Sequence, residues 1–316
     1  MNINQLNYLK ELVFKGSFTL AAESLDISQP ALSTQIRLLE EEMELVLIDR
    51  NHKPLILTPD GEKFMQIALE ILQRIDAIKE LPFLLAKEVK GELRIGIIPT
   101  LAPYFVPMFI DGLNNEYPEL ELIIEELITN DIVHRLRTGH LDAGIVSTPL
   151  EAGNLTTLPL FYEKFFLYVS DKHPLYDKTE IEISDFDPED LWYLQEGNCF
   201  QNQVNAICKL AGKQERFQSL IYNSNSIESL RRIVESRHGM TFIPELATLM
   251  IPSEQEDMIK PIKGSAPVRE ISMIFGSLYK KKHLLDAFTK TLLSQLPSSM
   301  KKRPEMWVVD SGLKID

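Results

Sequence analysis

Residues 18–40 read F-T-L-A-A-E-S-L-D-I-S-Q-P-A-L-S-T-Q-I-R-L-L-E, and this stretch decides the fold of the N-terminal part of the chain. Apolar and small residues recur at helical spacing on both sides of a short break at Asp26-Ile27. Ser17 can cap the first helix and Ser28 the second, in which Pro30 fits the first turn. Two helices joined by about three or four residues have the spacing of a helix-turn-helix.

The second helix of this pair has one apolar face and one polar face. Its apolar face carries Leu32, Ile36 and Leu39, which we expect to point into a helical core. Amide, hydroxyl and guanidinium groups, the types that read base edges in the major groove of DNA, occupy the opposite face. We therefore predict a DNA-reading face made of Gln29, Pro30, Ser33, Thr34 and Arg37. The alternative is a plain three-helix bundle with a solvated polar face.

A two-stranded wing is predicted directly after these helices. Two short apolar runs, 46–48 and 55–57, flank a polar stretch at 49–54. The tip of this hairpin carries Arg50, His52 and Lys53, which could reach phosphates or the minor groove. The sequence thus predicts a winged helix-turn-helix over residues 1–58.

A long helix is expected from Thr58-Pro59 toward Lys87, which gives a linker at residues 59–90. We expect Pro82 to end or kink this helix near Leu81. Apolar residues step by four and three along it, which is typical of a seam for a partner helix. The predicted dimer seam consists of Ala68, Ile71, Ile75 and Ile78. A surface helix that packs on its own domain would show the same stripe.

Length and charge set wider limits on the chain. Its 316 residues are enough for two or three domains, and its net charge of −13 by itself disfavours nucleic acid as a partner. Six Lys and Arg stand against ten carboxylates in residues 1–63, so any DNA contact must depend on where these few bases lie. The sequence shows no apolar run of membrane-spanning length and no apolar leader, and we expect a cytoplasmic protein without a membrane partner.

Short apolar strands alternate with helices from Gly91 onward. The strands are expected at 93–98, 120–125, 143–147, 165–170, 192–195, 240–243 and 271–275, and the helices at 102–116, 131–139, 200–211 and 226–237. This alternation predicts a mostly parallel sheet with flanking helices over residues 91–300. The length favours two subdomains with a crossover, one at about 91–164 and 268–300 and the other at about 165–267, followed by a C-terminal tail at 301–316.

The only cysteines of the chain, Cys199 and Cys208, lie in G-N-C-F-Q-N-Q-V-N-A-I-C, which reads as a helix capped by Asn198 and Gln201. Nine helical steps put the two sulfurs on opposite faces, with a rise of roughly 13 Å between them. A disulfide needs Cα atoms within roughly 7 Å, so the helix must refold if this bond forms. Cys199 stands at the helix start, where the dipole favours a thiolate. The bland alternative is that Cys208 is a small core residue.

No metal, cofactor or enzymatic site is predicted. The histidines have no carboxylate or cysteine at the spacing of metal ligands; those considered are His134, His140, His173, His238 and His283. Neither a G-x-S-x-G motif nor a phosphate-binding glycine loop is present.

Residues 18–40, together with L-I-D-R at 47–50 and L-T-P-D-G at 57–61, closely resemble the winged helix-turn-helix of LysR-type transcriptional regulators. The resemblance implies an α/β effector domain of two subdomains, similar to periplasmic binding proteins. It also implies a homotetramer built as a dimer of dimers, which binds operator DNA near promoters and works with RNA polymerase. The effector site of that family lies between the subdomains, near I-P-T at 98–100.

The segment around the two cysteines resembles the OxyR subfamily, whose members sense hydrogen peroxide. By this resemblance Cys199 is the peroxidatic thiol and Cys208 the resolving thiol of a reversible disulfide, which a cellular thiol reductant reopens. The resemblance places Thr100, Thr129 and Arg269 around the peroxide; the last lies in V-R-E-I-S-M-I-F. The chain departs from the subfamily at Asn198 and at Ile221, where histidines are usual.

Two other functions stay open at this point. One is a regulator of the same fold that binds a small organic anion without covalent chemistry. The other is a peroxide-consuming thiol enzyme, against which the helix-turn-helix argues because such an enzyme has no use for a DNA-reading helix.

Overall fold

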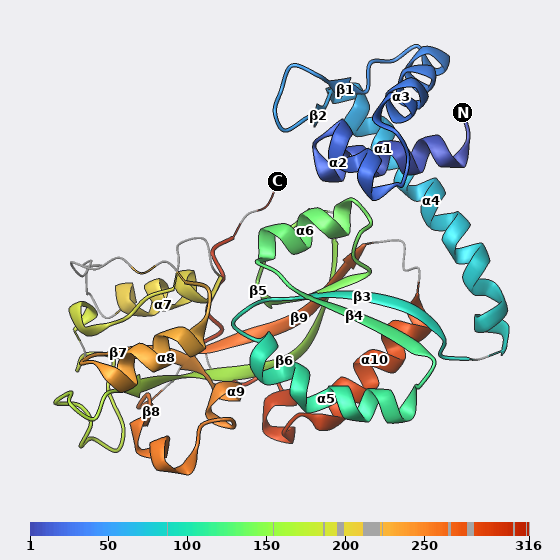
Figure 1. Cartoon of the computed structure of the whole chain (residues 1–316). Coiled ribbons are helices and arrows are strands. Elements are labelled where there is room, and N and C mark those ends of the chain that lie inside the picture. Colours follow the sequence, from blue (N-terminus) through green and yellow to red (C-terminus); the bar gives the residue numbers. More distant parts are fainter. Residues whose placement is uncertain are drawn as a thin grey trace.

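The computed structural model describes residues 1–86, 88–153, 155–185, 187–194, 199–210, 222, 224–264, 267–276, 281–305, 307–313 and 315. A small N-terminal domain and a long helix, α4, lie beside a larger α/β domain of two lobes (Figure 1). The lobe with α5, α6 and α10 is subdomain I, and the lobe with α7, α8 and α9 is subdomain II.

The N-terminal domain contains α1 (Ile3–Lys15), α2 (Phe18–Ser24), α3 (Gln29–Met43) and the hairpin of β1 (Ile48–Asp49) and β2 (Ile56–Leu57). Asn2 and Gln5 form a capping box at the start of α1, and Gly16 ends that helix with a φ of 61°. Ser28 caps α3 by accepting from the amide of Ala31, whereas the side chain of Ser17 makes no cap bond on α2. The predicted helix-turn-helix and wing are present.

The L-T-P-D-G motif joins the wing to α4. The Thr58 hydroxyl donates to the carbonyl of Val46 and accepts from the amide of Gly61, so it caps α4 and holds the wing. A Cβ on Gly61 would lie 2.1 Å from the carbonyl oxygen of Leu47. Only glycine therefore fits this close approach of the first turn of α4 to the wing.

Helix α4 (Pro59–Ala86) continues through Pro82, so of the two predicted outcomes at this proline, an end or a kink of the helix, the end is wrong. Proline already has a helical φ, and the helix loses a single hydrogen bond at this residue. The apolar residues of α4 form two stripes. One stripe contains Ala68 and Leu72, which are buried against Leu6 of α1 in the same chain.

The other stripe of α4 is exposed. It consists of Ile67, Ile71, Ile78, Leu81 and Leu85, whose exposed fractions run from 36% to 75%. Ile75 lies between the two stripes and is half-buried. The assignment of Ala68 to an outward seam is therefore corrected, because helical spacing alone does not separate neighbouring stripes.

The larger domain contains the strands β3 (Gly91–Ile97), β4 (Leu120–Glu126), β5 (Ala143–Thr148), β6 (Leu155–Val169), β7 (Met240–Pro244), β8 (Ile259–Pro261) and β9 (Val268–Gly276). Its helices are α5 (Ala102–Glu116), α6 (Thr129–Arg137), α7 (Cys199–Leu210), α8 (Ile227–Ser236), α9 (Glu245–Thr248) and α10 (Lys282–Gln295). Short 3-10 turns lie at Pro188–Asp190, Ser253–Met258 and Ser298–Lys301.

In the described residues, seven strands form one sheet in the order β4-β3-β5-β9-β6-β7, with β8 also paired to β6. Only the pairings of β3 with β4 and β5 are parallel, so the prediction of a mostly parallel sheet is wrong. Strand β9 comes from late in the chain and lies between β5 and β6, antiparallel to both, and β7 and β8 also pair antiparallel with β6. The predicted strand at 192–195 is reduced to an isolated bridge between Leu191 and Met240, and Gln195 lies outside the described residues.

The long strands β6 and β9 carry the chain from one subdomain to the other. In β6, Lys164 pairs with Val268 of β9, and the next residue, Phe165, pairs with Pro244 of β7. The predicted subdomain boundary at 164/165 falls at this change of partner. The strand itself begins ten residues earlier than the predicted 165, at Leu155.

Residues 307–313, within the predicted C-terminal tail, pack against the larger domain. Val308 bridges Val268 of β9, and Val309 and Ser311 are fully buried. In Figure 1 the end of the chain passes between α7 and α6.

The N-terminal domain contacts the larger domain through α1. The Lys10 ammonium donates to the carbonyl of Gly139 at 2.9 Å. His140 lies 3.0 Å from the Glu11 carboxylate, and its ring stacks on Phe14 with centroids 3.7 Å apart. Both contacted residues directly follow α6.

In the part of the chain that the structure describes, no helix is long and apolar enough to cross a membrane.

We predict that the exposed stripe of α4 packs against a second chain. Replacing Ile71 and Ile78 with Glu would bury charge in that seam and should dissociate the assembly into smaller species. Sedimentation velocity measures the outcome. The control is Ile56→Glu, the same chemical change at an exposed isoleucine of the wing. An unchanged sedimentation coefficient for the double variant would contradict the prediction.

Candidate functional site

Most of the predicted DNA-reading face of α3 is open to solvent. Gln29, Pro30, Thr34 and Arg37 are exposed and Ser33 is half-buried. The Thr34 hydroxyl donates to the carbonyl of Pro30 at 2.8 Å, and the Arg37 guanidinium donates to Glu41 at 2.6 Å. The face is therefore available to a macromolecule, and its one guanidinium is held by an exposed, weak ion pair.

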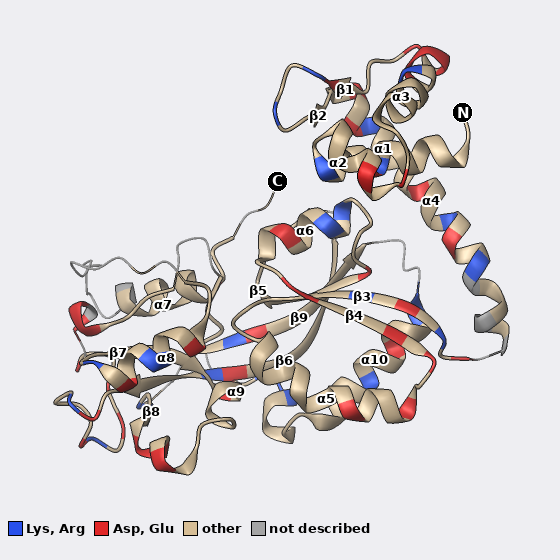
Figure 2. Ribbon diagram, in the orientation of Figure 1, with Lys and Arg blue, Asp and Glu red and all other residues tan. Residues whose placement is uncertain are grey.

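Arg50 and His52 of the wing are also paired with carboxylates, and Lys53, the third basic residue, is exposed. Arg50 donates to Glu40 at 2.9 Å, and His52 lies 3.0 Å from Asp49. Figure 2 shows basic segments on the loop between β1 and β2, and both basic and acidic segments on α3. A phosphate backbone would compete for these bases, because the side chains of Arg50 and His52 are about half exposed, at 47% and 59%.

The second candidate site surrounds Cys199, the first residue of α7. Its sulfur lies 2.9 Å from the hydroxyl of Thr129, the first residue of α6 in the other subdomain. Two helix N-termini therefore meet at this sulfur. Both side chains are buried, and the structure brings together these two predicted site residues.

Burial raises the pKa of the Cys199 thiol to about 11, although the Thr129 hydroxyl and the Arg269 charge act in the opposite direction. The helix dipole favours a thiolate at this position, whereas burial acts in the opposite direction. Cys199 is 3% exposed, and the loss of hydration of the charged form is the largest effect on its pKa. At neutral pH the group is a thiol in this conformation.

A cavity of about 10 Å³ adjoins the sulfur. It is lined by Ile98, Pro99, Ile128, Thr129 and Cys199. Such a volume holds about one water molecule. The described residues thus leave room for a very small molecule beside the thiol, far below the roughly 300 Å³ that drug-sized ligands need.

Thr100 and Arg269 contact each other near this cavity. The Arg269 guanidinium donates to the Thr100 hydroxyl at 3.0 Å and to its carbonyl at 3.2 Å. It also binds Glu163 of β6 at 2.7 Å and lies 5.0 Å from the ring centroid of Phe200. Glu163 was not among the residues predicted from the sequence, although an acidic residue beside Lys164 in the otherwise apolar run 158–169 is a signal that could have indicated it.

Cys208 is buried in the main core on the same helix, and neither cysteine forms a disulfide. Because α7 is intact from Cys199 to Leu210, the separation of roughly 13 Å expected from helix geometry holds here. Gln201 accepts from the amide of Leu194, and the predicted capping box with Asn198 lies outside the described residues. Asn198 and Ile221 lie outside the described residues.

The tertiary structure also brings together two histidines and an aspartate whose spacing in the sequence did not indicate a metal site. The side chains of His173, Asp190 and His238 offer ligand atoms within 4.8 Å of one another. However, Nδ1 of His173 accepts from the amide of Leu175, so its Nε2 carries the proton and donates to Asp190 at 3.1 Å. This pattern is typical of a hydrogen-bonded structural cluster.

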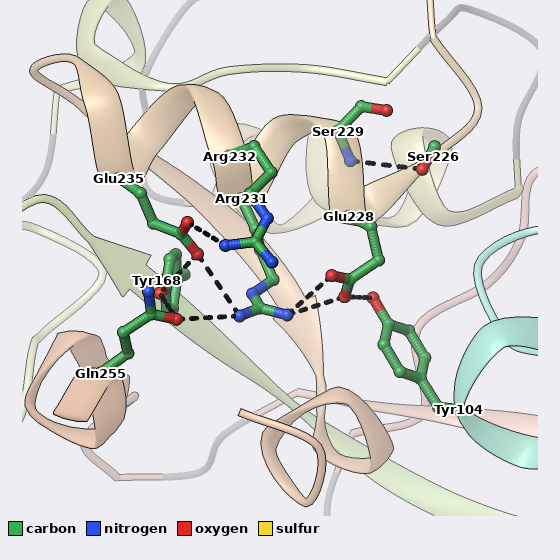
Figure 3. A network of polar contacts seen from close by, with 9 residues as sticks. All are labelled: Tyr104, Tyr168, Ser226, Glu228, Ser229, Arg231, Arg232, Glu235 and Gln255. Carbon is green, nitrogen blue, oxygen red and sulfur yellow. Dashed lines mark hydrogen bonds and ion pairs between the residues drawn. The ribbon is translucent and has the colours of Figure 1, made fainter. Parts of the chain in front are cut away.

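A polar network joins the two subdomains at α8 (Figure 3). The Tyr104 hydroxyl of α5 donates to Glu228 at 2.7 Å, and Glu228 accepts two bonds from Arg231. The guanidinium of Arg231 also lies over the Tyr168 ring, 5.0 Å from its centroid. Burial raises the pKa of Tyr104, which therefore remains a donor at physiological pH.

Family comparisons agree with this architecture. Residues 3–62 match the bacterial regulatory helix-turn-helix proteins of the LysR family, and residues 86–297 match the LysR substrate binding domain. The chain therefore belongs to the LysR family of bacterial regulators with a winged helix-turn-helix and a two-subdomain effector domain.

Within that family the chain is similar to OxyR proteins. It is 34% identical over 275 residues to the hydrogen peroxide-inducible genes activator of Haemophilus influenzae, covering 87% of this chain and 90% of that one. A full-length OxyR variant from Pseudomonas aeruginosa superposes with a TM-score of 0.78 at 27% identity, over 96% and 99% of the two chains. A mutant OxyR of Corynebacterium glutamicum with hydrogen peroxide bound has a TM-score of 0.61 at 25% identity, over 93% and 92%.

We expect Arg37→Ala to weaken operator binding by about 1–3 kcal/mol if this guanidinium reads a base, with much less effect on random DNA. Fluorescence anisotropy with both DNAs at one salt concentration measures the difference. Glu41→Gln serves as a control, since it frees Arg37 from its ion pair without removing the guanidinium. Equal losses on both DNAs would show that Arg37 contacts only phosphate.

Thr129→Val should slow the reaction of Cys199 with peroxide roughly two- to tenfold at neutral pH, because it removes the hydrogen bond that opposes the rise in the Cys199 pKa. The rate of the parent chain should itself climb with pH toward the Cys199 pKa, since only the thiolate attacks. Stopped-flow measurement of sulfenic acid, in a Cys208→Ser background, gives both profiles. Thr138→Val, which alters a hydroxyl bonded to the His134 carbonyl on the same helix, should leave the rate unchanged.

Proposed function

We propose that this chain is a DNA-binding transcriptional regulator that senses hydrogen peroxide through a reversible disulfide between Cys199 and Cys208. The observation that carries the proposal is the geometry at Cys199, where the sulfur lies at the start of α7, against Thr129, and beside a cavity of about 10 Å³. The cavity favours a very small oxidant as the signal.

The chemistry uses two thiols and one peroxide. The Cys199 thiolate attacks one peroxide oxygen and the O–O bond breaks, which leaves a sulfenic acid and releases water after proton uptake. The Cys208 thiol then attacks the sulfenic sulfur, forming the S–S bond and releasing a second water. A cellular thiol reductant returns both residues to thiols at the cost of its own oxidation.

The disulfide is incompatible with α7 as a helix. Cα atoms roughly 13 Å apart must approach within about 7 Å, so the segment 199–208 has to unwind. Its inward side chains, including Phe200 and Val204, would then leave the core of the domain. This rearrangement is the step that converts oxidation into a change in the assembly on promoter DNA.

The partners follow from the same proposal. Operator DNA binds the face of α3 and the wing, the exposed stripe of α4 pairs chains into dimers, and dimers associate into a homotetramer. RNA polymerase is the expected recipient of the signal at the promoter. We propose a regulator and not a peroxide-consuming enzyme, because such an enzyme has no use for a DNA-reading helix.

The structure gives less support to the alternative function, a regulator that binds a small organic anion without covalent chemistry. Near Cys199, where the two subdomains meet, the cationic group that would bind such a ligand is Arg269. This side chain is fully buried and already paired with Glu163. A larger cavity of about 660 Å³ lies between α1, α4 and the larger domain, and six lysines and arginines line it. Five of them form ion pairs with the five carboxylates of the same lining: Lys15 with Glu11, Lys79 with Asp76, Arg94 with Glu92, Arg135 with Glu125 and Lys281 with Asp142. This pairing disfavours the binding of an anion.

The test separates the two cysteines. Cys199→Ser should abolish peroxide-dependent transcription and keep DNA binding, whereas Cys208→Ser should still form a sulfenic acid but no intramolecular disulfide. In the parent chain, oxidation should raise amide hydrogen exchange across 200–208. Mass spectrometry and hydrogen exchange measure these outcomes. A Cys199→Ser chain that responds fully to peroxide would contradict the proposal and favour a regulator that responds to a noncovalently bound ligand.

A further inference from the structure

The middle of α7 is attached to the C-terminal end of the chain. Gln203 lies there, fully buried, between Cys199 and Cys208. Its amide nitrogen donates to the carbonyl of Val309 at 2.8 Å, and its amide oxygen accepts from the Ser147 hydroxyl at 3.2 Å. The neighbouring Asn202 donates to the carbonyl of Ser311 at 3.1 Å. Two adjacent side chains of α7 thus bind main-chain acceptors of one extended segment.

This C-terminal segment, residues 307–313 with Ile315, is anchored independently of α7. The amide of Val309 donates to the carbonyl of Val268 at 2.8 Å, and that of Ile315 donates to Glu151 at 2.9 Å. The Ser311 hydroxyl donates to the carbonyl of Pro149. The segment therefore stays attached to β9 and to the 149–151 loop whatever α7 does. It lies beyond residues 86–297, the part that matches the LysR substrate binding domain.

The two contacts of α7 depend on its helical state. Gln203 and Asn202 lie inside the ten residues that must change conformation when the sulfurs approach each other. Their side chains reach Val309 and Ser311 from consecutive helical positions, and unwinding moves both away from these fixed carbonyls. The hydrogen bonds thus belong to the dithiol form only.

From this geometry we infer that Gln203 is a positioning residue, which binds the C-terminal segment and thereby sets how readily the Cys199–Cys208 disulfide forms. The inference rests on the proposed disulfide and assigns it a regulatory element. An interaction present in one of two states shifts the equilibrium toward that state by its full net free energy. The C-terminal segment accordingly holds the chain in the dithiol form and raises the peroxide level needed for the switch.

The test replaces Gln203 with Met, which has similar length and no hydrogen-bonding amide. Ser147 keeps a partner in this variant, because its hydroxyl also contacts the carbonyl of Glu270. In a glutathione buffer, where the dithiol and oxidised glutathione exchange with the disulfide and two reduced glutathiones, the equilibrium constant should move toward the disulfide by roughly three- to tenfold. The reduced variant should also lose amide protection within 203–208.

Thr241→Val is the matched control. It removes another buried side-chain hydrogen bond of subdomain II, from Thr241 to the carbonyl of Trp192, without touching α7 or the C-terminal segment. Its glutathione equilibrium should equal that of the parent chain. A shift of the same size in this control would show that general loss of stability, and not the attachment of α7, moves the equilibrium, and would overturn the inference.

A chain that ends at Arg303 provides the second arm. It should favour the disulfide to at least the same extent, and adding Gln203→Met to it should have no further effect, since both changes remove the same contact. Additive effects would overturn the inference.

The outcomes also separate the inference from the proposed function. If the parent chain forms no Cys199–Cys208 disulfide, both the proposed function and the inference fail. If the parent forms the bond and Gln203→Met leaves its equilibrium unchanged, only the positioning role fails.

Discussion

The buried ion pair between Arg269 and Glu163 holds the centre of the larger domain. The two residues are register partners on β9 and β6, at the crossing from one subdomain to the other, and both side chains are fully buried. Arg269 also binds Thr100 of subdomain I and lies over Phe200 of α7. Removing one partner of such a pair costs about 3–5 kcal/mol because the other charge stays buried. The position of the Cys199 helix therefore depends on this pair.

Burial and reactivity oppose each other at Cys199. The same packing that places its sulfur against Thr129 raises the pKa of the thiol to about 11 and leaves a cavity of only about 10 Å³. Desolvation is the largest effect on this pKa, ahead of the Thr129 hydrogen bond and the Arg269 charge. The packing that limits the size of the cavity therefore also disfavours the thiolate, which is the reactive form of the thiol.

Charge is arranged locally in this acidic chain. Bulk charge disfavours DNA, yet the exposed face of α3 and the wing carry their few bases at one end of the molecule. Several of those bases are held by carboxylates, as Arg37 is by Glu41 and Arg50 by Glu40. Such exposed pairs are weak and screened by salt. Binding of phosphates would thus exchange one partner for another, which keeps nonspecific affinity low.

The sequence by itself determined the winged helix-turn-helix, the cap at Ser28 and the cysteine spacing, because these depend on local periodicity and on residues a few positions apart. It could not assign Ala68 to the inner stripe of α4, predict the mixed sheet, or find Glu163 and Gln203. Periodicity reports which face of an element is apolar, but not which distant element covers it. Packing between segments 70 to 106 residues apart decided the contacts of Cys199 with Thr129, of Arg269 with Glu163 and of Gln203 with Val309.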